Sequence, residues 1–363
     1  NAANGELQLK IPTDSPFTRL ASTADGKKLV TVARDKSIRS FDPTPPNPKP
    51  PAAPSRDVAQ LLSGHTGDIH SLALGVDNTT MVTASADGTV KTCKVAATGF
   101  SQNYTGHGGY VAGLAFNPDG TRLVSASSDK TVRLWDTTTN KVIRTLSTQP
   151  SQVYAVAFSP DGKLFVAQNY QFISSVAKIW NTETLAEVRA FKLPQSGTIS
   201  RFSPDGEFVA VGCQDGNVRV WNVKSGARQT IMVLGGAVSD IQYTPDGKTL
   251  VASADSGRIR AFDADTGYGL HDAWDIQAYQ FEVDEHDGRF VAVGCQDGNQ
   301  FLIRLETGEI TKLLPRSLNT VSDVKFSPDG STIVSVPFGG RLRAWDTTTH
   351  KLLFETPELD YYN

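Results

Sequence analysis

The chain has 363 residues, 39% of them hydrophobic and 20% charged, and a formal net charge of −3 at pH 7. This composition argues against a disordered or fibrous protein, and the lack of a positive excess argues against nucleic acid as the main ligand. No stretch approaches the roughly 18 apolar residues of a membrane helix, so we expect no membrane insertion.

An internal repeat runs through the whole chain. Asp-Gly recurs at Asp25, Asp119, Asp161, Asp205, Asp246, Asp287 and Asp329, and Asp77-Asn78 fills the one missing place. From Asp77 onward, successive sites are 42, 42, 44, 41, 41 and 42 residues apart. This period is typical of one blade of a β-propeller.

Each repeat has the same internal order of four short runs, named a to d here. An apolar run such as Val153–Phe158 precedes the Asp-Gly turn, whose glycine supplies the positive φ of a tight hairpin. Three more runs follow, as in Arg122–Ala126, Thr131–Asp136 and Lys141–Leu146. Runs of about five residues, rich in Val, Ile, Leu and Thr and separated by turns, leave no room for helices. We predict an all-β fold.

The third strands give the number of blades. There are eight, at Ser37–Phe41, Thr89–Cys93, Thr131–Trp135, Val176–Trp180, Asn217–Trp221, Arg258–Phe262, Asn299–Ile303 and Arg341–Trp345. One blade cannot cover both of its apolar faces, so neighbours must stack and the ring must close. We predict a closed β-propeller of eight four-stranded blades, a single domain over residues 1–363; seven blades with one stray unit is the alternative. Glu6–Ile11 and Lys351–Thr356 both resemble fourth strands, and we expect one of them to close the ring.

The repeats resemble WD repeats (WD-40), a family named for a terminal Trp-Asp that follows a Gly-His. The third repeat carries the whole pattern, with Gly106-His107, Ser127, Asp129 and Trp135-Asp136. The resemblance implies a hydrogen-bonded chain of His107, Ser127, Asp129 and Trp135. Such a chain is physically sensible, because a buried carboxylate must be paired and an imidazole N–H and a hydroxyl can satisfy it.

Other repeats depart from this pattern. In the second repeat His65, Ser85 and Asp87 are kept, but Cys93 stands where Trp belongs. The variable endings, few lysines and Pro-Asp-Gly turns resemble the bacterial branch of the family, in which propellers are often fused to enzymatic or cytochrome modules. The fold serves many tasks, so the resemblance alone does not give a function.

No constellation for catalysis stands out in the sequence. It contains no G-x-S-x-G, H-E-x-x-H, P-loop or EF-hand motif. The three cysteines, Cys93, Cys213 and Cys295, lack the spacing of a zinc or haem site. We predict no catalytic residue, no metal and no cofactor, and no enzymatic activity unless the chain is part of a larger fused protein. Because it begins with Asn1, we expect a processed protein or a piece of a longer one.

Places where a repeat is broken are candidates for function. Residues 43–56 form a proline-rich loop in the first blade, which is either a docking strip or a stiff surface loop. The fourth repeat inserts about three residues and places Tyr170 and Phe172 at a hairpin tip. There they either contact a partner or fold over their own blade.

The resemblance also indicates a binding face. In propellers of this family, partners commonly bind the face formed by the d–a and b–c loops. Aligning the repeats places four residues at b–c turns: Arg34, Gln214, Gln296 and Phe338. It places six at the openings of first strands: Thr18, His70, Tyr154, Ser239, Tyr279 and Ser322. Tyr110 lies near such an opening. Tyrosine and arginine are typical of interaction hot spots.

Two functions follow from these patterns. The first is a non-catalytic scaffold that binds a protein partner, or a neighbouring domain of the same chain, through this face. The alternative is a propeller enzyme or small-ligand sensor, whose site would lie at the mouth of the central channel and be lined by His70, Tyr154 and Tyr279. Compartment and oligomeric state are not predicted.

Overall fold

The computed structural model of the chain describes residues 17–41, 60–62, 64–95, 102–146, 151–169, 175–338 and 341–355. These residues form strands β1 to β32, with no helix among them. Three predicted features lie outside the described residues: the proline-rich loop 43–56, the strand Glu6–Ile11, and the hairpin tip with Tyr170 and Phe172.

The strands form eight four-stranded sheets, one for each repeat, and strands that follow each other in the chain pair within a sheet. The prediction of an all-β, eight-bladed β-propeller is confirmed, and the seven-bladed alternative is wrong. The sheets are numbered here in chain order. Four strands per repeat arise because each repeat carries three turns, at the places where the sequence has its Asp, Asn and Gly residues.

The chain forms two compact units, which are described separately. Unit 1 comprises Asn1–Gly64, Cys93–Phe100 and Tyr279–Asn363, and unit 2 comprises His65–Thr92 and Ser101–Ala278. Unit 1 therefore holds the first, seventh and eighth sheets and unit 2 the second to sixth, with β7 and β25 divided between them at Cys93 and Tyr279. A single domain over residues 1–363 stays a prediction.

The sheets of unit 1 have the following strands: β1 (Phe17–Ser22), β2 (Leu29–Ala33), β3 (Ile38–Phe41) and β4 (Gln60–Leu62) in the first; β25 (Ala278–Val283), β26 (Phe290–Cys295), β27 (Gln300–Arg304) and β28 (Ile310–Leu313) in the seventh; β29 (Val321–Phe326), β30 (Thr332–Pro337), β31 (Arg343–Asp346) and β32 (Leu352–Glu355) in the eighth.

The sheets of unit 2 have the following strands: β5 (Ile69–Leu74), β6 (Thr80–Ser85), β7 (Val90–Lys94) and β8 (Gln102–Tyr104) in the second; β9 (Val111–Phe116), β10 (Arg122–Ser127), β11 (Val132–Asp136) and β12 (Lys141–Leu146) in the third; β13 (Val153–Phe158), β14 (Leu164–Asn169), β15 (Ser175–Asn181) and β16 (Glu187–Leu193) in the fourth; β17 (Gly197–Phe202), β18 (Phe208–Cys213), β19 (Asn217–Asn222) and β20 (Arg228–Val233) in the fifth; β21 (Val238–Tyr243), β22 (Thr249–Ala254), β23 (Arg258–Asp263) and β24 (Trp274–Asp275) in the sixth.

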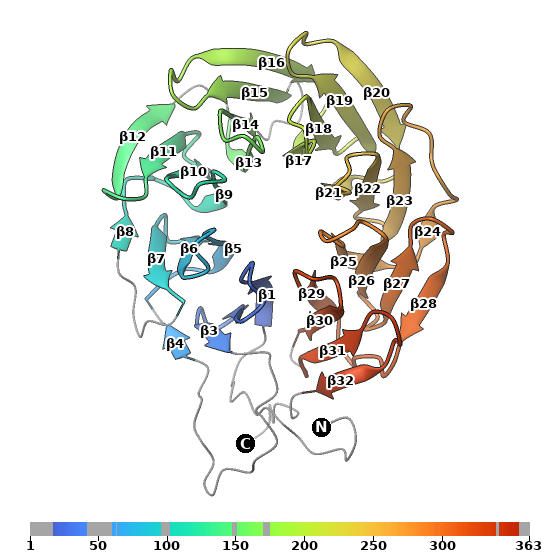
Figure 1. Ribbon diagram of the computed structural model, residues 1–363. Helices are drawn as coiled ribbons and strands as arrows, with labels where there is room; N and C mark the ends of the chain where they lie inside the picture. Colours follow the sequence, from blue (N-terminus) through green and yellow to red (C-terminus); the bar gives the residue numbers. More distant parts are fainter. Residues whose placement is uncertain are drawn as a thin grey trace, which may run out of the picture. The chain divides into compact units, whose positions relative to one another are not determined.

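In unit 2 successive sheets stack face to face (Figure 1), and the first strands β5, β9, β13, β17 and β21 contact one another in that order. Second strands are covered on both faces by the neighbouring sheets, so nearly every residue in them is buried, including polar ones such as Gln168 and Ser253. Between the third and fourth sheets, for example, Val124, Leu134 and Val153 pack with Phe165 and Trp180. Stacking thus covers faces that a single sheet would expose.

The Asp-Gly turns also join neighbouring sheets. Gly162 has a φ of +69°, and a Cβ atom built on it would lie 3.0 Å from Cδ of Pro118, in the turn of the preceding sheet. We expect Gly162→Ala to destabilise the chain by about 1–3 kcal/mol, because the left-handed conformation disfavours a Cβ and the proline must move. Thermal denaturation tests this. Gly108→Ala is the matched control, since its Cβ would meet nothing closer than 3.9 Å and its φ is not left-handed.

In unit 1 the first and last sheets of the chain pack against each other. Strand β1 contacts β29 and β30, and Leu20 and Leu29 share an apolar cluster with Val334 and Val336. The backbone N–H of Leu20 donates to Oδ2 of Asp323 at 2.9 Å. This is the contact that a closed propeller requires. Strand β32, at the predicted Lys351–Thr356, completes the eighth sheet by pairing with β31.

Candidate functional site

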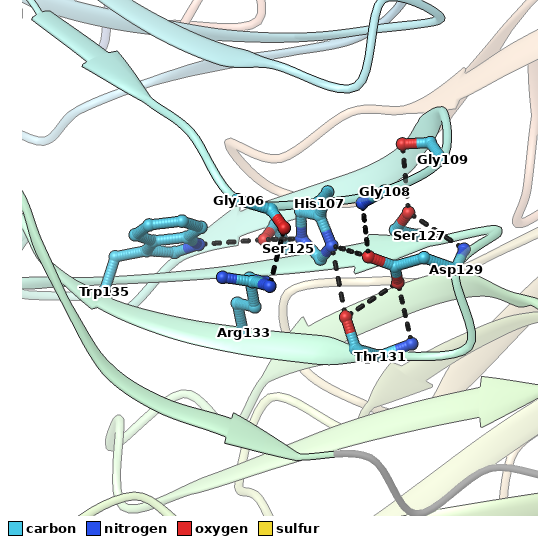
Figure 2. Close-up of polar contacts among 10 residues, drawn as sticks. All are labelled: Gly106, His107, Gly108, Gly109, Ser125, Ser127, Asp129, Thr131, Arg133 and Trp135. Atoms are coloured by element: carbon cyan, nitrogen blue, oxygen red, sulfur yellow. Dashed lines mark hydrogen bonds and ion pairs between the residues drawn. The ribbon is translucent and has the colours of Figure 1, made fainter.

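A hydrogen-bonded chain holds the d–a and b–c loops of the third sheet (Figure 2). Nδ1 of His107 contacts Oδ2 of Asp129 at 2.9 Å, and its Nε2 contacts Oγ of Ser125 at 2.8 Å. The indole N–H of Trp135 donates to the same Ser125 Oγ at 2.8 Å. The chain therefore runs from the b–c turn, through the d–a loop, to the third strand.

The serine in this hydrogen-bonded chain is Ser125 and not the predicted Ser127. The hydroxyl of Ser127 donates to the carbonyl oxygen of Gly109 at 3.2 Å and accepts from the N–H of Asp129 at 3.1 Å. Alternate residues of a strand share a face, so both serines point the same way. However, Ser127 ends β10 beside the turn, and only Ser125 lies deep enough to reach the indole.

The second sheet repeats this arrangement. Nε2 of His65 contacts Oγ1 of Thr83 at 2.8 Å, whereas the hydroxyl of Ser85 donates to the carbonyl oxygen of Gly67 at 2.9 Å. Cys93, at the position of Trp135, is buried. Thr83 and Ser125 are therefore equivalent, and both were missed because each lies two residues before a serine that fits the sequence pattern equally well.

The pKa shifts of His107 and Asp129 indicate that this hydrogen-bonded chain has a structural role. Burial lowers the pKa of His107, although Asp129 opposes this shift. Burial alone would raise the pKa of Asp129, but hydrogen bonds from Thr131, Gly108 and His107 lower it to about 2. A neutral imidazole fits the geometry: Nδ1–H donates to the carboxylate, and Nε2 accepts from the Ser125 hydroxyl. Both ring nitrogens are thus engaged in structural hydrogen bonds, one to the b–c turn and one to β10.

Aromatic side chains form a row across three sheets of unit 2. The rings of His70 and Tyr110 are 5.8 Å apart between centroids, and those of Tyr110 and Tyr154 are 6.0 Å apart. The two tyrosine hydroxyls contact each other, and both donate to Oε1 of Gln152, at 3.2 Å from Tyr110 and 2.7 Å from Tyr154. His70, Tyr110, Tyr154 and Gln152 are called the aromatic row below. Gln152 was missed, because a glutamine in a d–a loop carries no signal by itself.

A second aromatic group lies in unit 1. The rings of Tyr279 on β25 and Phe338 after β30 are 5.8 Å apart, edge to face, and Tyr279 is 40% exposed. Arg34 and Gln296 are exposed at b–c turns of the same unit. Leu318, in the d–a loop between β28 and β29, is 83% exposed. It was missed because a leucine in a d–a loop carries no sequence signal of its exposure.

The other strand-opening candidates face inward or bond within their own sheets. Ser322 is buried, and its hydroxyl donates to the carbonyl oxygen of Val336 at 2.7 Å. Ser239 contacts the hydroxyl of Ser253, and Thr18 donates to the carbonyl oxygen of Val32. Gln214 is half-buried at the b–c turn of the fifth sheet, one sheet beyond Tyr154.

In the described ranges no group of three or more His, Cys, Asp or Glu side chains is placed to hold a metal ion. Cys93, Cys213 and Cys295 are free and buried, and burial raises the pKa of each thiol, to about 12, 11 and 12 respectively. The part of the chain that the structure describes contains no helix able to span a membrane.

Comparison with known proteins gives matches of three kinds. A family model described as IFT122 first beta-propeller matches residues 68–284, and one described as WD domain, G-beta repeat matches residues 308–346. The crystal structure of the computationally designed Ika8 protein is similar with a TM-score of 0.68 and 25% identity, over 81% of this chain and 88% of that one.

The third match is to a curated relative, the Target of rapamycin complex subunit LST8 of Saccharomyces cerevisiae. It is 36% identical over 92 residues, which are 25% of this chain and 27% of the yeast protein. The aligned region thus spans about a quarter of that relative. Because this relative is from a yeast, the predicted bacterial branch gains no support.

Proposed function

The chain belongs to the WD-repeat β-propeller family, whose members generally act as protein-interaction scaffolds and not as enzymes, and from this premise we propose that it is itself such a scaffold. It binds a protein partner, or a neighbouring domain of its own chain, through the face formed by its d–a and b–c loops. No catalytic residue is assigned.

The observation that carries this proposal is the grouping of aromatic side chains at these loops in each unit. In unit 2 the aromatic row spans three successive sheets, and in unit 1 Tyr279 packs against Phe338. Large, rigid side chains with a polar tip give much contact area at low entropic cost, and they are enriched at protein interfaces. The hydrogen-bonded chains of the second and third sheets preorganise the loops around the row, which lowers the cost of binding.

The test is to replace Tyr154, Tyr279 and Phe338 together by Ala. We expect the folded chain to survive, because these side chains are half-buried or exposed. Affinity for a protein that co-purifies with the unchanged chain should fall at least about tenfold, since hot-spot residues each contribute about 2 kcal/mol or more. Circular dichroism checks the fold, and quantitative affinity purification from the native cell measures binding.

The matched control replaces three exposed apolar side chains that lie in or beside a–b and c–d turns, away from the d–a and b–c loops: Val76, Val142 and Tyr268, also by Ala. Retention of the partner by this control, with loss in the first variant, supports the proposed face. Equal recovery of the partner by both variants and the unchanged chain would count against it.

A further inference from the structure

The d–a loop between β28 and β29 is held firmly in unit 1. Ser317 is buried at the position that His107 occupies in the third sheet; its hydroxyl accepts from Nε2 of Gln300 at 2.9 Å and from Nη1 of Arg343 at 2.7 Å. The indole N–H of Trp345 donates to the carbonyl oxygen of Leu314 at 3.2 Å. The loop is therefore fixed at its start and middle without the family's His and Asp.

This fixed loop holds apolar side chains in solvent. Leu318 is 83% and Leu314 62% exposed, although the third sheet has a glycine, Gly108, at the place of Leu318. The N–H of Phe338 donates to the carbonyl oxygen of Thr320 at 2.8 Å, which puts the Tyr279–Phe338 pair beside the loop. Single exposed leucines are ordinary, but a group of them next to aromatic rings is typical of an interaction site.

Two arginines are exposed in the loops around this group. Arg316 is exposed in the same loop, and Arg34 is exposed at the b–c turn of the adjacent first sheet. Neither has an ion-pair partner among the described residues of the chain. Of the nearby carboxylates, Asp35 lies 3.8 Å from the guanidinium of Arg39, whereas Asp297 accepts hydrogen bonds from the N–H and side-chain amide of Asn299 and keeps its charge.

We infer that this surface binds an acidic peptide segment that carries an apolar anchor. The surface comprises Arg34, Tyr279, Leu314, Arg316, Leu318 and Phe338, and is called the unit 1 surface below. Leu318 and the two aromatic rings receive the anchor, and the two free guanidinium groups pair with carboxylates, which arginine can bind in a bidentate manner. The inference rests on the proposed scaffold function and specifies the partner's chemistry.

Two synthetic fluorescent peptides test this inference on the full chain by fluorescence anisotropy. Both carry the same Leu and Phe anchors, spaced by Glu in one and by Lys in the other. We expect the Glu peptide to bind, more weakly as salt rises, and the Lys peptide not to bind. Arg316→Glu and Leu318→Ser should each weaken binding of the Glu peptide about tenfold. Both sites are exposed, so the variants should keep their circular dichroism spectra.

Lys27→Glu is the matched control, because it reverses one charge on an a–b turn of the same unit, where the Lys27 side chain is 76% exposed. It should leave binding unchanged. Equal weakening by Lys27→Glu and Arg316→Glu overturns the inference. It is also overturned if neither of the two peptides binds. Binding of the Lys peptide that depends on Leu318 overturns the acidic preference while leaving the scaffold function standing, since that function is tested by the triple Ala variant.

Discussion

Replacing Lys325 by Met is expected to cost about 3 kcal/mol of folding free energy at pH 8, because it leaves buried carboxylates without their cation. Lys325 on β29 donates to Oε2 of Glu282 on β25, so it joins the eighth sheet to the seventh. Glu282 and Asp323 are both buried. The other charged groups near them are Glu285, which faces Glu282, and Arg19 on β1, which faces Asp323.

The folding free energy lost through Lys325→Met should be smaller at pH 5 than at pH 8. Burial raises the pKa of Glu282 to about 7 and also raises that of Asp323, while Lys325 lowers both. Removing Lys325 raises them further. A carboxyl group whose pKa is higher in the folded chain than in the unfolded one favours folding at low pH, and this contribution is lost as pH rises through the folded pKa. Protonation at pH 5 therefore relieves the unpaired charges.

Urea denaturation at both pH values measures these effects. Lys163→Met is the control, because its ion pair with Asp161 at 3.4 Å is well exposed and should contribute less than about 1 kcal/mol. Adding Glu282→Gln to Lys325→Met should restore part of the loss, since one of the unpaired charges is then gone. An equal loss at pH 5 and pH 8 would contradict the electrostatic explanation.

Replacing Ser125 by Ala is expected to cost about 2–6 kcal/mol, because it leaves two buried groups without a hydrogen-bond partner. The indole N–H of Trp135 loses its acceptor, and Nε2 of His107 loses its donor. Each unsatisfied buried group costs about 1–3 kcal/mol. Chemical denaturation measures the loss, and the line width and shift of the Trp135 indole proton in NMR report the broken bond directly.

Two variants make this test specific. Ser127→Ala should cost about 1 kcal/mol, because its hydroxyl bonds only to backbone groups next to the turn. Ser125→Thr should be close to the unchanged chain, since Thr83 fills the same position in the second sheet. A larger loss of folding free energy for Ser127→Ala than for Ser125→Ala would show that Ser127, and not Ser125, links His107 to Trp135.

The sheets could be predicted from sequence because the turns are chemically explicit. Asp-Gly pairs at a regular spacing mark the a–b hairpins, and four short runs between them leave one arrangement, which the eight sheets confirm. The choice between Ser125 and Ser127 could not be made in this way. A strand pattern gives the face of a residue but not its depth along the sheet, and only depth distinguishes the two.

The candidate site was predictable only in outline. Alignment of the repeats placed Tyr154 and Tyr279 at equivalent strand openings, but their neighbours depend on loops that vary between repeats. Gln152 bonds to two tyrosines that come from different sheets, and Leu318 follows Ser317, which Gln300 and Arg343 hold in a buried position. Both follow from contacts between segments, so local sequence patterns do not reveal them.

The packing of the first sheet on the last has a consequence for biosynthesis. Leu20 and Asp323, which bond across this junction, are 303 residues apart in the chain. At a translation rate of about 5–20 residues per second, the apolar surface around Leu20 and Leu29 waits on the order of 15–60 s for its partners Val334 and Val336 to leave the ribosome. During that interval the apolar surface of the first repeat stays uncovered, so this repeat reaches its native packing only after the last repeat has been made.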